Sequence, residues 1–127
     1  MPRLRLSSSV LATMVVAIAS PAQEGVRLAQ TISMPNVQGG FNHMSVDSAH
    51  DRLFAAAPTN MTLEVIDLAA YKPFASRTGE KPAAALYAPE FNQVYVSRGQ
   101  SVVIYDGTTL ALTGAIDLHS NLDPALR

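Results

Sequence analysis

The chain has 127 residues, which is enough for one small domain. Hydrophobic residues make up 48% of it and charged residues only 15%, a composition typical of a folded protein and not of a disordered chain. Nine Lys/Arg against ten Asp/Glu give a net charge of -1, so no basic excess favours nucleic-acid binding. The absence of cysteine excludes disulfides, thiolate metal sites and a thiol nucleophile.

The first 22 residues have the pattern of a secretory signal peptide. Arg3 and Arg5 give a positive start, and the stretch Val10–Ala19 is uncharged and mostly apolar. Small residues in Ala17–Ala19 and in Ser20–Ala22 offer two peptidase sites. An uncleaved membrane anchor is the alternative, but a span needs about 20 apolar residues, and polar residues follow this stretch too soon. We therefore expect residues 1–22 to be removed, and the mature chain to be periplasmic or extracellular without a membrane span.

A lead-in over residues 23–39 precedes a series of predicted β-strands. Short runs rich in β-branched and aromatic residues alternate with turn sequences that contain Asp, Asn, Pro or Gly. The expected strands are Asn42–Asp47, Arg52–Ala57, Met61–Asp67, Lys72–Arg77, Ala83–Tyr87, Gln93–Ser97, Ser101–Tyr105 and Ala111–Asp117. Their starts lie 8 to 11 residues apart, a spacing typical of antiparallel meanders. The sequence thus predicts an all-β fold.

The predicted strands repeat as a unit of four. A shift of 41 residues places Asp51–Ala55 on Asn92–Val96, and the order polar, polar, aliphatic, aromatic, small is kept. With a two-residue deletion in the next loop, Glu64–Asp67 falls on Val103–Asp106, and each set ends in an Asp that can accept hydrogen bonds from the following turn. Units of about 40 residues with four strands are typical of β-propeller blades. A chance similarity between two β-meanders is the alternative.

The repeated segments resemble YVTN-type β-propeller proteins. The segments that carry this resemblance are Gly40–Asp47, Arg52–Ala56 and Leu63–Asp67 in a first unit, and Asn92–Ser97 and Val103–Gly107 in a second. Tyr95–Arg98 stands where the family usually has Tyr-Val-Thr-Asn, so the turn asparagine is lost. The resemblance covers residues 40–120. It implies a partial propeller over residues 40–127, with two four-stranded antiparallel blades and the start of a third.

A closed propeller needs four to eight blades, or about 160 to 320 residues. Only 105 residues remain after the signal peptide. We therefore expect the chain to be the N-terminal piece of a longer, truncated propeller, with a small β-sandwich or a ring of several short chains as alternatives. Two blades alone leave two outer faces bare, which predicts self-association.

Histidine supplies the one candidate binding residue. None of His43, His50 and His119 is spaced from another so that two metal ligands share a strand face. His43 follows Gly39 and Gly40 at the start of a first strand, and in the resembling family this strand is innermost and its end lines the axial mouth. His43 is therefore the candidate contact for a ligand at the mouth. A half-buried histidine bonded to the backbone of the next blade is the alternative.

Other functional motifs are absent from the sequence. It has no Gly-x-Ser-x-Gly elbow, no phosphate-binding glycine loop and no Cys-x-x-Cys-His haem motif. The strand-end residues Asp47, Asp67 and Asp106 are interpreted as turn caps and not as calcium ligands. The strand aromatics are interpreted as core, and His50 as a solvated turn residue; these aromatics are Phe54, Phe74, Tyr87, Tyr95 and Tyr105.

The sequence thus predicts a non-catalytic, exported propeller scaffold that binds a small molecule or a protein. We assign no catalytic, cofactor-binding or metal-binding residue, and the cofactor stays unknown. The alternative is the N-terminal part of a propeller enzyme domain, either a lactonase-like metal hydrolase or a redox-linked propeller.

Overall fold

The computed structural model describes residues 25–79 and 81–118, which contain eight β-strands and no helix. The signal peptide predicted over residues 1–22 lies outside the described residues. The strands are β1 (Met44–Asp47), β2 (Arg52–Ala57), β3 (Thr62–Asp67), β4 (Lys72–Thr78), β5 (Ala84–Ala88), β6 (Gln93–Arg98), β7 (Ser101–Asp106) and β8 (Leu112–Asp117). The all-β prediction is confirmed, and every predicted strand is present with bounds that differ by at most two residues.

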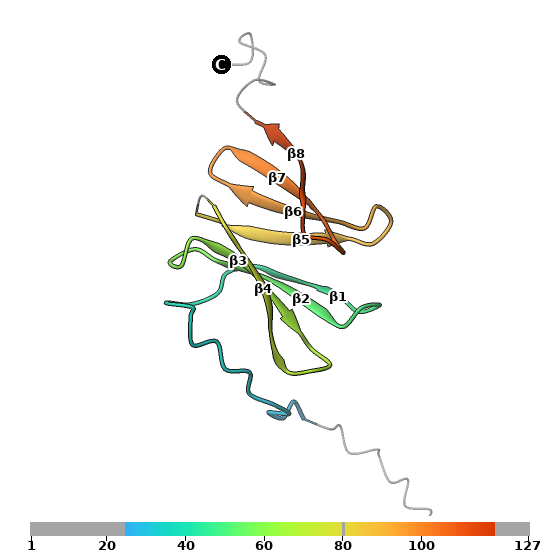
Figure 1. The fold of residues 1–127 in the computed structure, drawn as a ribbon. Helices are drawn as coiled ribbons and strands as arrows, with labels where there is room; N and C mark the ends of the chain where they lie inside the picture. The colour runs from blue at the N-terminus through green and yellow to red at the C-terminus, as the bar shows by residue number, and fades with distance from the viewer. Residues whose placement is uncertain (1–24, 80, 119–127) are drawn as a thin grey trace, which may run out of the picture.

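The strands form two four-stranded antiparallel sheets, with the orders β1-β2-β3-β4 and β5-β6-β7-β8. We call these sheets the first and the second blade. In Figure 1 they lie stacked face to face, and each is a simple meander in chain order. At the start of the innermost strands, His43 forms a parallel bridge with Ala84. Neighbouring blades of a β-propeller are arranged in this way.

The pairing register confirms that the two blades repeat one unit. A cross-strand row in the first blade, the first-blade row, consists of Ser45, Phe54, Val65 and Ala75. The second-blade row occupies the equivalent positions with Leu86, Tyr95, Ile104 and Gly114. Each blade has its register shift directly after the third member of its row, at Val65/Ile66 and at Ile104/Tyr105. The two rows are therefore equivalent in pairing as well as in sequence.

Turn conformations repeat as well. Asp51 and Asn92, which the 41-residue shift superimposes, have φ angles of 50° and 49°. Asp and Asn adopt this left-handed conformation more readily than other non-glycine residues. Tyr71 and Leu110 hold the same conformation in the hairpin between the third and fourth strands of each blade, with φ angles of 53° and 59°. The backbone of both hairpins is thus set in the same way in the two units.

The hydrophobic core lies between the two blades. Phe54 of the first-blade row is fully buried and stacks on Tyr87 of β5, with the ring centroids 5.5 Å apart. The core residues are Phe54, Leu63, Val65, Ala85, Tyr87, Val94, Val96, Val103, Tyr105 and Leu110. Full burial of one large apolar side chain contributes about 1.5–3 kcal/mol. Since both blades contribute to this one cluster, each stabilises the other.

Two aromatic residues interpreted as core lie outside it. Tyr95 is only partly buried and does not belong to the core cluster, and Phe74 is 49% exposed. Val65 pairs with Ala75 while Ile66 pairs with Pro73, so Phe74 is the extra residue of a bulge and has no partner across the pair. The guanidinium of Arg52 lies 4.5 Å from the centroid of the Phe74 ring.

Phe54→Ala is expected to lower the free energy of unfolding by about 3–5 kcal/mol, because it leaves a cavity at the centre of the blade interface. Phe91→Ala serves as the matched control, since Phe91 is 70% exposed in a turn and should change stability by less than about 0.5 kcal/mol. Urea denaturation of the three proteins measures both effects. Equal losses in the two variants would show that the blades do not depend on this interface.

Candidate functional site

His43 occupies the predicted position directly before β1, and its side chain is exposed. Its backbone carbonyl accepts a hydrogen bond from the N–H of Ala56 at 3.4 Å, while the parallel bridge to Ala84 places it beside the second blade. Over residues 25–79 and 81–118, no group of three or more His, Cys, Asp or Glu side chains is placed to hold a metal ion. A ligand contact at His43 stays a prediction, and His119 lies outside the described residues.

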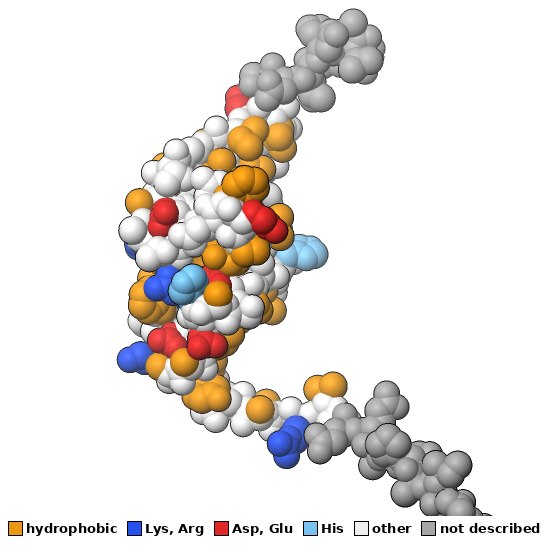
Figure 2. All heavy atoms as spheres, turned by 90° about the vertical axis from the view of Figure 1, so that its right-hand side faces the viewer, with side chains coloured by type: hydrophobic (Ala, Val, Ile, Leu, Met, Phe, Trp, Pro, Cys, Tyr) orange, Lys and Arg blue, Asp and Glu red, His pale blue; other side chains and the backbone are white. Residues whose placement is uncertain are grey.

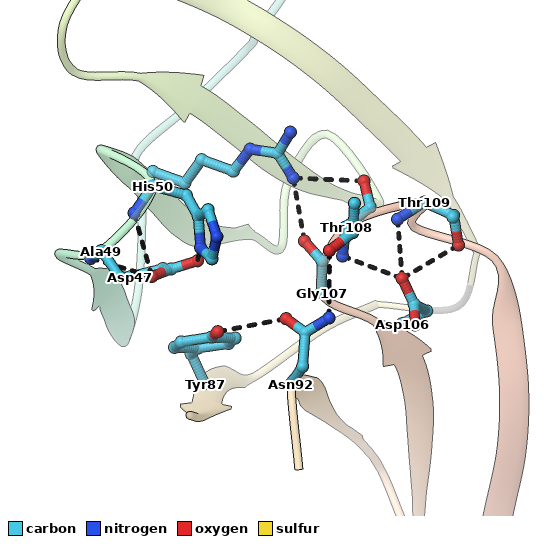
Figure 3. Close-up of polar contacts among 10 residues, drawn as sticks. Asp47, Ala49, His50, Tyr87, Asn92, Asp106, Gly107, Thr108 and Thr109 are labelled. Carbon is cyan, nitrogen blue, oxygen red and sulfur yellow. Dashed lines mark hydrogen bonds and ion pairs between the residues drawn. The ribbon is translucent and has the colours of Figure 1, made fainter. Parts of the chain in front are cut away.

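A cluster of polar side chains lies where three turns meet at one end of the blade interface (Figure 3). The turns are those between β1 and β2, between β5 and β6, and between β7 and β8. We call this group the junction cluster, and it consists of Asp47, His50, Arg52, Tyr87, Asn92, Asp106, Gly107, Thr108 and Thr109. Its members come from both blades, so the cluster spans the interface.

Asp47 fixes the first of these turns. Its carboxylate is 2% exposed; Oδ1 accepts hydrogen bonds from the N–H groups of Ala49 and His50 at 3.1 and 3.3 Å, and Oδ2 lies 2.7 Å from Nδ1 of His50. Burial raises the pKa of Asp47, but the hydrogen bond and charge of His50 and the two backbone bonds outweigh burial, so the net pKa lies below 3.8. The turn-cap prediction for Asp47 is confirmed. His50 is 59% exposed, yet this contact holds its ring in place.

Tyr87 and Asn92 connect the second turn to the third. The Tyr87 hydroxyl donates to Oδ1 of Asn92 at 3.1 Å, and Nδ2 of Asn92 donates to Oγ1 of Thr108 at 3.0 Å. Burial and the negative charge of Asp47 raise the pKa of Tyr87 above 10.0, so its hydroxyl remains a donor at neutral pH. A Cβ on Gly107 would lie only 2.5 Å from Oδ1 of Asn92, which explains why a glycine is needed there.

Two arginines of the first blade bind backbone carbonyls of the second. Arg52 donates from one terminal nitrogen to the carbonyls of Gly107 at 2.9 Å and Thr108 at 3.2 Å. Arg77 donates from Nε to the carbonyl of Leu110 at 3.0 Å. Asp106 fixes the same turn by accepting the N–H groups of Thr109 and Thr108 at 2.7 and 2.9 Å, and these bonds lower its pKa. The turn-cap prediction is thus also confirmed for Asp106.

The hydrogen bonds of the junction cluster connect turns of the two blades, which is a structural role. Among the described residues, no buried side-chain nitrogen or oxygen lacks a hydrogen-bond partner. Asp47 and His50 form a carboxylate–imidazole pair, but no hydroxyl hydrogen-bonded to His50 is present in the described part of the chain to complete a nucleophilic triad. Sequence reasoning missed the roles of Arg52 and Arg77, because a backbone carbonyl that accepts from a distant arginine leaves no mark in the sequence.

A pocket of about 260 Å³ lies on the first blade, away from the junction cluster. It lies between the lead-in and β4, and its lining residues are Met34, Pro35, Asn36, Val37, Asn60, Glu64, Pro73, Phe74, Ala75 and Ser76. Glu64 is 4% exposed, and its Oε1 accepts hydrogen bonds from the hydroxyls of Thr62 at 2.6 Å and Ser76 at 2.8 Å. Nothing in the sequence marks Glu64 as unusual, because one acid in a strand is usually a solvent-facing residue.

The side view in Figure 2 shows how charge is distributed over the end of the blades. Acidic and basic side chains are interspersed with hydrophobic ones, and no continuous basic patch is visible on this face. The described residues contain no helix, so none of them forms a helix able to cross a membrane.

Comparison with solved structures supports the fold. The chain is similar to hydrazine synthase from Kuenenia stuttgartiensis (TM-score 0.55, 13% identity, 61% of this chain and 23% of that one). It is also similar to Sqt1 from Saccharomyces cerevisiae (TM-score 0.55, 11% identity, 71% and 24%) and to the WD40 repeats of RRP9 (TM-score 0.52, 13% identity, 58% and 23%). WD40 repeats form β-propellers. No family model and no curated protein matches the sequence.

These similarities establish the class of the protein. The described residues form two blades of a β-propeller fold, which confirms the fold predicted from the repeat. The chain spans about a quarter of the length of the solved structures that it matches. At these identities the comparisons show the fold alone.

Asp47→Asn is expected to lower stability at neutral pH and to flatten its pH dependence in acid. Because the pKa of Asp47 is lowered on folding, its contribution is complete above the unfolded value of 3.8 and is lost as pH falls through the folded pKa. Chemical denaturation between about pH 7 and pH 3 measures this contribution. Asp51→Asn is the control, because Asp51 is exposed and its φ of 50° suits asparagine. Identical pH curves for wild type and Asp47→Asn would refute the assignment.

Proposed function

We propose that this chain supplies two consecutive blades to a β-propeller that acts as a binding scaffold without catalytic residues of its own. The equivalence of the two rows carries this proposal. The first-blade row is buried against the second blade, with Phe54 and Val65 at 0% exposure. In the second-blade row Leu86 is 62% exposed, and Tyr95 and Ile104 are only partly buried.

The exposed second-blade row marks an interaction surface. Ile116 of β8 pairs with Val102, which is on the same face of the sheet as Ile104, and adds exposed apolar area at 40% exposure. Contiguous apolar surface of this kind is typical of interfaces. We infer that a further blade-like sheet covers it, because an equivalent sheet already covers the equivalent row of the first blade. In a closed ring, each blade is covered on both faces in this way.

The scaffold would bind its ligand at the axis of the ring. The innermost strands β1 and β5 lie side by side, and the exposed side chain of His43 precedes the first of them. We infer that His43 faces the axial channel, where its imidazole would contact a small molecule or a protein together with groups from other blades. Three features support this inference: the position of His43, its exposure and the parallel bridge to Ala84.

Two finer parts of the proposal come from the sequence. The resemblance of residues 40–120 to YVTN-type propeller proteins supports blades of that kind. The basic start, apolar stretch and small-residue exit of residues 1–22 support export to the periplasm or the cell exterior.

The chain without residues 1–22 is expected to self-associate with increasing concentration, because the second-blade row has no cover in the single chain. Leu86→Lys should shift the population toward monomer, since it places a charge at the 62% exposed apolar side chain of that row. Val26→Lys is the matched control, because Val26 is fully exposed in the lead-in and lies outside both blades. Sedimentation velocity measures the three populations. A wild-type chain that stays monomeric at every concentration would contradict the proposal.

Export and cleavage of the signal peptide are tested by locating the expressed chain and by determining its N-terminal residue. Expressed with residues 1–22 in a bacterial host, the chain is expected in the periplasmic fraction, beginning at Ser20 or Gln23 by mass spectrometry. Replacing Arg3 and Arg5 together by Glu removes the positive start and should leave the chain uncleaved in the cytoplasm. Arg27→Glu, a charge reversal outside the signal, should change neither location nor cleavage. Periplasmic product that still begins at Met1 would rule out a cleaved signal.

A further inference from the structure

A buried carboxylate lies on the face of the first blade that points away from the second. Glu64 of β3 is 4% exposed, and the repeat places it at the position that Val103 holds in the second blade. Val103 belongs to the apolar core between the blades. Burial of an ionised carboxylate is unfavourable unless opposite charge and hydrogen bonds compensate for the lost water. The substitution of an acid for an apolar residue at this position therefore needs a reason.

The partners of Glu64 compensate only part of this cost. Its Oε1 accepts hydrogen bonds from Thr62 and Ser76, which are both neutral hydroxyls. Within the described residues no Lys, Arg or His forms an ion pair with Glu64, and its Oε2 accepts no hydrogen bond. Because no buried side-chain oxygen in this part of the chain lacks a partner, Oε2 must still touch open space.

Glu64 is also one of the residues that line the pocket of about 260 Å³ between the lead-in and β4. Glu64 is its one charged lining residue, and Met34, Val37 and Phe74 give it apolar walls. Arg52, which stacks on Phe74, does not line the pocket, and its guanidinium donates to the carbonyls of Gly107 and Thr108. The pocket thus combines one negative charge that is only partly compensated with hydrocarbon and aromatic surface.

We propose that this pocket binds a small organic cation, a short alkylammonium in its simplest form. The ammonium group donates a charge-assisted hydrogen bond to Oε2 of Glu64, and the hydrocarbon part lies against Met34 and Val37. The ring of Phe74 adds a wall that attracts cations. This site is distinct from His43 and from the junction cluster, because its lining residues come from the lead-in, from Asn60 and from β3 and β4, and include none of those residues.

The test is a titration of the full chain, followed by NMR, with three probes of equal length: n-butylammonium, 1-butanol and butyrate. Butylammonium is expected to shift the NMR signals of Val37, Ala75 and Ser76 until the site is saturated. Butanol and butyrate are expected to produce no saturable shift. Glu64→Gln keeps an oxygen acceptor for Thr62 and Ser76 but removes the charge, and it should weaken binding of butylammonium at least about tenfold. Glu90→Gln is the matched control, because Glu90 is exposed and lies outside the pocket.

A second variant keeps the test valid if Glu64→Gln fails to fold. Met34→Lys changes only the lead-in and places a tethered ammonium at the pocket, so added butylammonium should no longer bind. Shifts of equal size with 1-butanol, undiminished binding of butylammonium to Glu64→Gln, or no saturable shift at all would each overturn the proposal.

Discussion

The packing of Phe54 on Tyr87 is the interaction on which the rest of the structure depends. A four-stranded meander of this length has no interior of its own, since each of its faces must be covered by something else. The first blade contributes Phe54, Leu63 and Val65 to the core, and the second blade contributes side chains of β5, β6, β7 and the turn that follows β7. The two sheets therefore depend on each other for burial, and every other contact between them is positioned by this apolar interface.

The junction cluster converts that packing into a fixed orientation. An apolar interface has little directional preference, whereas the hydrogen bonds from Arg52 and Arg77 to carbonyls of the β7–β8 turn require one arrangement. Tyr87 belongs to both systems, because its ring lies in the core while its hydroxyl binds Asn92 and its N–H donates to Ser45. Burial of Tyr87 stabilises its ring in the core, and the same burial raises the pKa of its hydroxyl, which therefore stays protonated.

Local chemistry was the part of this structure that could be predicted from the sequence. Strand positions and turn caps follow from short-range patterns, and Asp67 and Asp106 accept turn N–H groups as expected. The sequence patterns do not show which face of a strand packs against the neighbouring blade. Tyr95 has the same pattern as Phe54 but lies on the open face, and the bulge in β4 moves Phe74 out of the core.

The candidate site was predictable to the same limited degree. The position of His43 at the start of an innermost strand follows from the repeat, but its surroundings depend on segments distant in sequence. No sequence pattern marks Glu64 as a site residue. A single acid in a strand is common, and Glu64 is unusual only because the fold buries it. Only the comparison of equivalent positions, with Val103 in the core of the other unit, makes the acid unusual.

The two outer faces of the blade pair are not complementary, and this bears on how the pair is completed. One face presents the apolar second-blade row, and the other presents Glu64 with Thr62 and Ser76. Head-to-tail stacking of identical chains would press the apolar row against the carboxylate and bury its charge with no donor for Oε2 and no opposite charge, which is strongly unfavourable. A ring of several copies of this chain, one of the alternatives left by the sequence, is therefore disfavoured. The sheet that meets the face of Glu64 must leave the pocket beside this carboxylate open for its cation, whereas the sheet that meets the second-blade row needs an apolar face, so two different neighbours fit this pair better than one.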